Sequence, residues 1–255
     1  MDSTVPPAQR KNQLGEDRAP RREPGGDRRG PDGGSRGGRI MSWKEKLLVM
    51  TASGALLGTL TACGDGGWQE GHRYGKWRLA YHGYGMVTGD DREVLMYPTS
   101  ATDEDTTHAC LVVTDEEFEG DIDFSVTVRT EEQVRQGEPN TWEVGWVLWD
   151  YQDDEHFYAL ALKPNGWELS KQDPDYRGNQ RFLMSGHEPR FPVNQDYRAR
   201  IVQVGNTITV FADGVQLGEF TDTETPYHRG SIGLYTEDAK VRFSDLEIES
   251  AQSAD

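Results

Sequence analysis

Apolar and polar residues alternate along much of the second half of the chain, in short runs separated by turn-forming residues. The runs at 124–130, 156–163 and 197–204 are rich in β-branched and aromatic residues, and several keep a period of two. This alternation is typical of β-strands that bury one face. The same composition predicts further strands at 143–151, 167–172, 207–213, 231–237 and 241–249.

Turn signals lie between these runs. Pro-Asn-Gly at 164–166, Gly-Asn at 205–206 and Asp-Gly at 213–214 are typical of β-hairpins. No stretch sustains a helical period over three turns. So many short strands predict a single all-β domain over residues 68–255, a β-sandwich or jelly roll.

The chain before this domain has a different composition. Residues 1–40 contain almost no large apolar side chains and many Gly, Pro and Arg, so we expect them to be disordered. In residues 41–62, two lysines precede an apolar run, the pattern of a signal peptide too short to span a membrane comfortably. Because signal peptides begin near their own methionine, we expect Met41 to be the true start, with 1–40 an upstream extension.

The signal-peptide pattern ends in Leu-Thr-Ala-Cys at 60–63, which resembles a bacterial lipobox. The resemblance implies cleavage before Cys63, a lipid on that cysteine, and a glycine-rich tether at 63–67. The protein is then expected to be exported and lipid-anchored to the outer face of the bacterial cell membrane. The alternative is a short buried helix that happens to end in cysteine. Cys110, in a strand-like run, is expected to be a small buried hydrophobe.

Charge narrows the expected partners. The chain has a formal net charge of −17 at pH 7, and residues 63–255 are more acidic still because the first 62 residues carry a net positive charge. A domain this acidic repels nucleic acid and anionic headgroups. We therefore expect no nucleic-acid partner and membrane contact through the lipid alone.

Three runs, at 156–171, 197–222 and 229–249, together resemble the concanavalin A-like lectin/glucanase superfamily. The last combines Gly-x-Ile-Gly-Leu-Tyr, an acidic turn and Val-x-Phe-x-Asp-Leu-x-Ile, and is similar to the closing strands of such jelly rolls. The chain resembles in particular the domains grouped with family 16 glycoside hydrolases and 3-keto-disaccharide hydrolases. The resemblance implies a concanavalin A-like jelly-roll β-sandwich. The Glu-x-Asp-x-x-Glu strand of family 16 enzymes is missing, so it assigns no catalytic residue.

Four of the seven tryptophans lie between residues 142 and 171. Successive strand residues point to opposite faces. By that rule Trp142 and Trp146 share an apolar face, which we assign to the core between the sheets. Trp149 lies on the other, mixed face.

The mixed face is the candidate ligand-binding surface. It is predicted to carry Glu143, Trp149 and Lys163, with Glu168 on the neighbouring strand. An aromatic ring among charged side chains suits a sugar, whose apolar C–H face stacks while its hydroxyls form hydrogen bonds. The alternative is a solvated sheet face with one awkwardly placed tryptophan.

Three functions remain open at this point. The domain binds carbohydrate without cleaving it, hydrolyses glycosidic bonds, or serves as an envelope scaffold for another protein. Hydrolysis needs a pair of carboxylates, for which Glu143 and Glu168 are candidates. In so acidic a chain, however, suitable pairs also arise by chance.

A structural calcium ion is the remaining cofactor candidate, since the superfamily resemblance implies one where the chain ends meet. The candidate ligands are Glu237, Asp238 and Asp245 in the closing strands, with the acidic residues 103–105 in an early loop. Carboxylate oxygens on loops suit Ca²⁺. The alternative is that these are solvated acidic turns.

Overall fold

The computed structural model describes residues 67–102 and 106–254. The extension, the signal peptide and Cys63 lie outside these ranges, so the predictions for them stay predictions. The all-β prediction is confirmed, because the described residues form strands and no helix. Accordingly, the described ranges offer no apolar helix that could cross a membrane.

Fifteen strands form in the described ranges. Their bounds are β1 Arg73–Tyr74, β2 Trp77–His82, β3 Met86–Gly89, β4 Glu93–Tyr97, β5 Ala109–Thr114, β6 Phe118–Gln133, β7 Gly145–Asp153, β8 His156–Lys163, β9 Gly166–Gln172, β10 Gln180–Gly186, β11 Tyr197–Val204, β12 Thr207–Ala212, β13 Val215–Thr221, β14 Arg229–Glu237 and β15 Ala239–Ser253.

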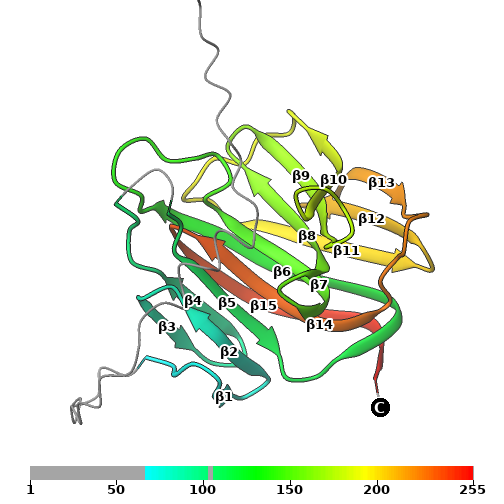
Figure 1. The fold of residues 1–255 in the computed structure, drawn as a ribbon, viewed down its shortest axis with the longest axis horizontal. Coiled ribbons are helices and arrows are strands. Elements are labelled where there is room, and N and C mark those ends of the chain that lie inside the picture. Colours follow the sequence, from blue (N-terminus) through cyan, green and yellow to red (C-terminus); the bar gives the residue numbers. More distant parts are fainter. Residues whose placement is uncertain (1–66, 103–105, 255) are drawn as a thin grey trace, which may run out of the picture. The chain divides into compact units, whose positions relative to one another are not determined.

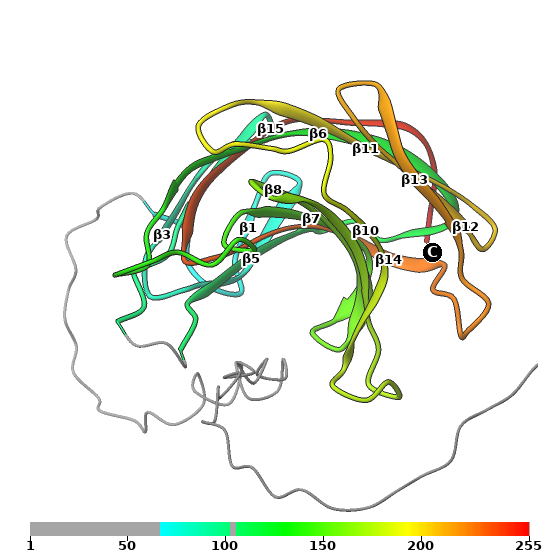
Figure 2. The ribbon, with the colours of Figure 1, turned by 90° about the horizontal axis from the view of Figure 1, so that it is seen from above.

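The strands form two antiparallel sheets packed as a sandwich (Figure 1). Sheet A has the order β1-β2-β5-β14-β7-β8-β9-β10, and sheet B has the order β3-β4-β15-β6-β11-β12-β13. Figure 2 shows both sheets curved, with sheet A on the inner side. We call the side of sheet A that is turned away from sheet B its concave face.

Strand β14 belongs to both sheets. Its first residues, Arg229 and Gly230, pair with β6 of sheet B. From Ser231 onward the strand pairs with β7, and from Gly233 onward also with β5. The hydrogen-bonded ladder therefore continues from one layer of the sandwich into the other.

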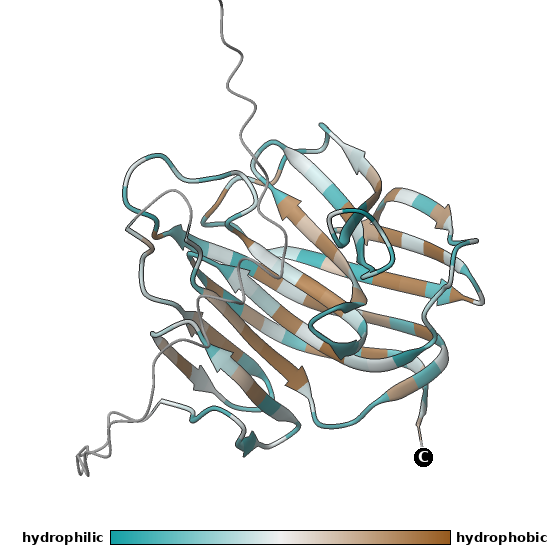
Figure 3. Ribbon diagram, in the orientation of Figure 1, coloured by the Kyte–Doolittle hydropathy of each residue, from teal (hydrophilic) through white to brown (hydrophobic). Residues whose placement is uncertain are grey.

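The main hydrophobic core fills the space between the sheets, and the strands alternate in hydropathy as such a core requires (Figure 3). A second buried cluster lies on the concave face of sheet A. Its members come from β5, β7, β8, β14 and the residue before β7: Leu111, Val113, Val144, Trp146, Leu148, Phe157, Ala159, Ala161 and Tyr235.

The predicted orientation of β7 is wrong. Trp149 is fully buried in the core between the sheets, where its indole N–H donates to Gln203 at 2.8 Å. Trp146 lies on the concave face instead, and Trp142 is 38% exposed rather than in the core. Alternation shows which residues share a face, but both faces of β7 are apolar. The sequence of this strand therefore cannot show which face meets sheet B.

The predicted hairpin turns are confirmed at 164–165, 205–206 and 213–214. Asp213 and Gly214 both have positive φ, 49° and 77°. Two successive residues of positive φ are what a type I′ hairpin turn requires, and Asp-Gly supplies them with little strain.

A buried polar network surrounds Gln203 of β11. Its amide nitrogen donates to Asp150 at 3.1 Å and to the carbonyl of Tyr227 at 2.8 Å, while its oxygen accepts from Trp149. Burial raises the pKa of Asp150 to about 7, although the hydrogen bond from Gln203 opposes that shift. The network thus places an ionisable group beside the largest buried ring of the core.

Candidate functional site

The concave face between β8 and β10 gathers polar side chains around an exposed aromatic ring. Ala159 lies opposite Ser170, and Ser170 lies opposite Phe182. Ala161 similarly lies opposite Glu168, which faces Ser185. Directly opposed residues of antiparallel strands point to the same face. Both rows therefore belong to the face that carries the second hydrophobic cluster.

A third row adds Gln172 and Gln180, which are paired with each other across β9 and β10. Together the polar and exposed residues of these rows form what we call the β8–β10 patch: Lys163, Glu168, Ser170, Gln172, Gln180, Phe182 and Ser185.

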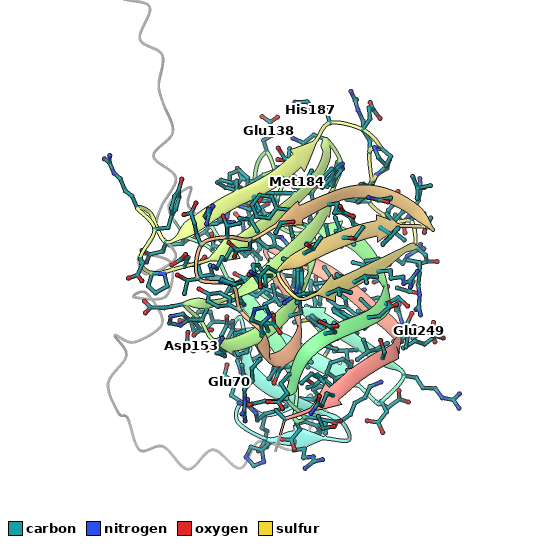
Figure 4. All side chains as sticks on the ribbon, turned by 90° about the vertical axis from the view of Figure 1, so that its right-hand side faces the viewer. Glu70, Glu138, Asp153, Met184, His187 and Glu249 are labelled. Atoms are coloured by element: carbon teal, nitrogen blue, oxygen red, sulfur yellow. The ribbon has the colours of Figure 1, made fainter. Side chains whose placement is uncertain are left out.

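A β-bulge in β10 sets the direction of the aromatic ring. The register shifts between Phe182 and Met184, so Phe182 shares the concave face with its partner Ser170. Met184 turns in between the sheets and packs against the main core (Figure 4). A side chain on Gly218 of β13 would meet the Met184 methyl at 2.8 Å. The glycine therefore lets the edges of the two sheets approach, and β10 presents its aromatic residue outward, 52% exposed.

Lys163 and Glu168 are brought together, as the sequence predicted for this face. They flank the turn at 164–165, and the Lys163 ammonium donates to Glu168 Oε2 at 2.6 Å. Both side chains are largely but not fully buried. The pair offers a ligand both charged donors and a carboxylate oxygen at the edge of the patch.

Gln172 is buried, and its amide nitrogen has no hydrogen-bond partner. A buried donor without a partner costs about 1–3 kcal/mol. Gln180 is better placed, since its amide donates to the Ser170 hydroxyl at 3.4 Å. Of the two amides, only that of Gln180 is partly exposed and open to a ligand, whereas that of Gln172 is covered.

The other end of the concave face carries a different polar group. The hydroxyls of Tyr151 and Tyr81 donate to the same oxygen of Asp154, at 2.9 Å and 3.4 Å. Burial raises the pKa of Asp154, although the two phenol hydrogen bonds oppose that shift. Asp154 lies in the β7–β8 turn and does not belong to the patch.

Glu143 is not in this face, which corrects the sequence-based assignment. Its carboxylate is fully buried, accepts a hydrogen bond from Arg135 Nε, and receives two more from Asn140 at 2.8 Å and 3.1 Å. Arg135 also donates to Asp238 at 2.8 Å. Glu143 therefore stabilises the loop before β7 and has no surface for a ligand.

The predicted calcium ligands are not brought together. Asp238 accepts from Arg135 and from the Ala101 backbone N–H at 2.8 Å, and Glu237 accepts from the Tyr235 hydroxyl at 2.6 Å. Asp245 is exposed. No group of three or more His, Cys, Asp or Glu side chains in 67–102 and 106–254 is placed to hold a metal ion, and residues 103–105 lie outside those ranges.

Several patch residues escaped the sequence analysis. Phe182 and Gln180 lie in β10, which was not predicted because its bulge interrupts the alternation of Gln-Arg-Phe-Leu-Met-Ser-Gly. Gln172 lies in the predicted strand 167–172, but the sequence assigned it no role in binding. The turn at 164–165 fixes the β8–β9 pairing and could have identified the face of Gln172, but it carries no information on β10.

The chain was compared with known proteins. A family model described as "3-keto-alpha-glucoside-1,2-lyase-like domain" matches residues 65–249. No curated protein matches the chain.

Among solved structures, the carbohydrate binding module CBM66 from Bacillus subtilis is 12% identical, covering 69% of this chain and 97% of its own, with a TM-score of 0.53. A protein of unknown function with a galectin-like fold from Bacillus subtilis is 16% identical over 70% of this chain and 90% of its own (TM-score 0.47). The exoplasmic/lumenal domain of VIP36, in its Ca²⁺/Man3GlcNAc-bound form, is 13% identical over 68% and 83% (TM-score 0.47). At such identities the first similarity shows the jelly-roll fold alone.

Proposed function

Because the chain belongs to the 3-keto-alpha-glucoside-1,2-lyase-like domain family, we propose that its jelly-roll domain binds a saccharide at the β8–β10 patch. The observation that carries the proposal is the exposed Phe182 ring, surrounded on one sheet face by amides, hydroxyls and an ion pair. An aromatic platform with a few convergent polar groups is typical of sites for small polar ligands.

Each group has a distinct role in the proposed complex. The Phe182 ring packs against the C–H face of a pyranose. The partly exposed amide of Gln180 donates to a sugar hydroxyl, and the Lys163–Glu168 pair supplies a charged donor and an acceptor for others. Desolvating the sugar hydroxyls offsets much of this gain, so we expect modest affinity for each saccharide unit.

We expect binding without cleavage. Among the described strand residues of β8, β9 and β10 that point to this face, Glu168 is the single acid, and Lys163 holds one of its oxygens. Glycoside hydrolysis generally requires two carboxylates placed on either side of the scissile bond. Release of reducing sugar from a polymeric glycan, abolished in Glu168→Gln, is the result that would establish hydrolysis instead.

Replacing Phe182 by alanine is expected to abolish saccharide binding at the β8–β10 patch, and so to weaken glycan binding, while shifting the melting temperature by less than about 2 °C, because the ring is half exposed. A glycan array and a calorimetric melt of the full chain measure the two effects. Tyr176→Ala is the matched control, because Tyr176 is 46% exposed but lies in the β9–β10 connection outside the patch. Undiminished binding by Phe182→Ala would show that the patch is not the site.

We also propose that the domain is held at the outer face of the cell membrane by lipid on Cys63. The support is the order of lysines, apolar run and Leu-Thr-Ala-Cys in residues 44–63. Changing Cys63 to alanine is expected to leave the whole precursor unprocessed and the protein without lipid. Mass spectrometry of the membrane fraction measures this, and an unmodified N-terminus at another residue would contradict the proposal.

A further inference from the structure

A pocket lies away from the β8–β10 patch and is lined by residues of β3, β4, β6 and the adjoining loops. Its volume is about 440 Å³, and its lining includes Met86, Tyr97, Thr99, Ser100, Glu132 and Val134. This volume is in the range of small-molecule sites. Strands β3 and β10 lie toward opposite ends of the fold in both ribbon views (Figures 1 and 2), so the two sites are separate.

The pairing register places the key side chains on the outer face of sheet B. Met86 lies opposite Tyr97, and Lys240 lies opposite Glu132. Met96 and Val241, which directly neighbour Tyr97 and Lys240 in sequence, are buried in the core between the sheets. Because successive strand residues alternate, Tyr97 and Lys240 point outward.

The pocket exposes apolar surface that the fold leaves uncovered. Met86 is 40% exposed and Tyr97 is 41% exposed. The ammonium of Lys240 lies 5.6 Å from the centroid of the Tyr97 ring. The ring therefore has a cation beside it and still presents a large part of its surface to solvent.

The acids around this pocket are not equivalent. Glu131 forms ion pairs with Lys240 at 2.9 Å and with Arg242 at 2.8 Å. The carboxylate of its neighbour Glu132, on the pocket wall, has no ion pair or hydrogen bond within the described residues. An unengaged acceptor thus lies beside an exposed ring in a site of suitable size.

We propose that this pocket is a second saccharide-binding site, which takes one pyranose unit of a glycan. The C–H face of the sugar packs on Tyr97 and Met86, while Glu132 accepts hydrogen bonds from its hydroxyls and Lys240 donates to them. A purely apolar ligand would desolvate the Glu132 carboxylate without giving it a hydrogen-bond donor. A cationic ligand would be opposed by the ammonium already beside the ring.

The ligand class rests on the proposed function, but the pocket shares no residue with the β8–β10 patch. Two sites on different sheets let one domain hold two segments of one polysaccharide, or segments of two polysaccharide molecules. Engaging both raises the apparent affinity for a polysaccharide far above that of either site alone.

The test is a calorimetric titration of the full chain in detergent with four hexasaccharides: cellohexaose, laminarihexaose, xylohexaose and maltohexaose. We expect two equivalents of the preferred probe to bind to the wild type, and one equivalent to either Tyr97→Ala or Phe182→Ala. Glu132→Gln should weaken the second site by roughly tenfold, since it removes a charged acceptor. Tyr84→Ala is the control, because Tyr84 is 55% exposed nearby but does not line the pocket.

The outcomes separate this proposal from the previous one. If the wild type binds one equivalent of saccharide and only Phe182→Ala fails to bind it, the second site is overturned and the proposed function stands. If the wild type binds one equivalent and only Tyr97→Ala fails to bind it, the pocket is supported and the patch is overturned. Absence of binding by all four probes counts against both. If the melting temperature of Tyr97→Ala is well below that of the wild type, Met86→Ala and Glu132→Gln replace it in the same titrations.

Discussion

Replacing Trp149 by alanine is expected to destabilise the domain by about 3–5 kcal/mol, the cost of emptying a large core site. The indole is fully buried, stacks on Tyr158 with ring centroids 5.4 Å apart, and donates to Gln203. Its loss also leaves the Gln203 oxygen buried without its donor, which adds to the cost. Urea unfolding followed by tryptophan fluorescence and far-ultraviolet circular dichroism measures the change.

Trp142→Ala is the matched control for this prediction. Trp142 lies just before the same strand but is 38% exposed, so its replacement should change the free energy of unfolding by less than ~1 kcal/mol. The comparison also tests the orientation of β7. A Trp149→Ala variant as stable as the wild type would contradict the burial of Trp149 between the sheets and with it the orientation of β7.

The second large effect concerns pH. Burial raises the pKa of Asp150 in the folded protein from 3.8 to about 7. Between these values the folded state keeps a proton that the unfolded state has released. The free energy of unfolding therefore falls as the pH rises through this interval, by roughly 1.4 kcal/mol per pH unit at most. The full contribution, about 4 kcal/mol, is present below pH 4 and lost above pH 7.

Asp150→Asn isolates this contribution, because asparagine resembles the protonated acid and also tolerates the positive φ of 49° at this position. We expect the variant to match the wild type near pH 4 and to be more stable by several kcal/mol at pH 8. Denaturant titrations of both proteins at each pH measure the difference. A difference that stays constant across this range would mean that Asp150 ionises as it does in water.

Strands with regular alternation and the hairpins between them could be predicted from the sequence. Contacts between residues far apart in the chain could not. The strands 156–163 and 197–204 match β8 and β11 in both bounds, because their alternation is regular and a turn signal closes each one. The Lys163–Glu168 pair also follows from local information, since the turn between them fixes the hairpin register.

The assignments that failed depend on partners far away in the chain. The face of β7 that carries Trp149 packs against sheet B, where Gln203 accepts the indole hydrogen bond and distant strands complete the core. Glu143 looks like a surface acid until Arg135 and Asp238 are brought around it. The early strands β1 to β4 are short and irregular, and they are defined by pairing with β5 and β15 rather than by their own pattern.

The place of β15 has a consequence for how the protein is made. This strand lies inside sheet B, between β4 and β6, although it follows both in the chain by a long interval. A nascent chain that has reached only β13 therefore exposes the ladder edges of β4 and β6 and cannot complete the sandwich. The pairings of β4 and β6 with β15 wait for the last strand to be synthesised, so sheet B stays incomplete while the chain is being extended. That delay is compatible with the export that we propose for this protein.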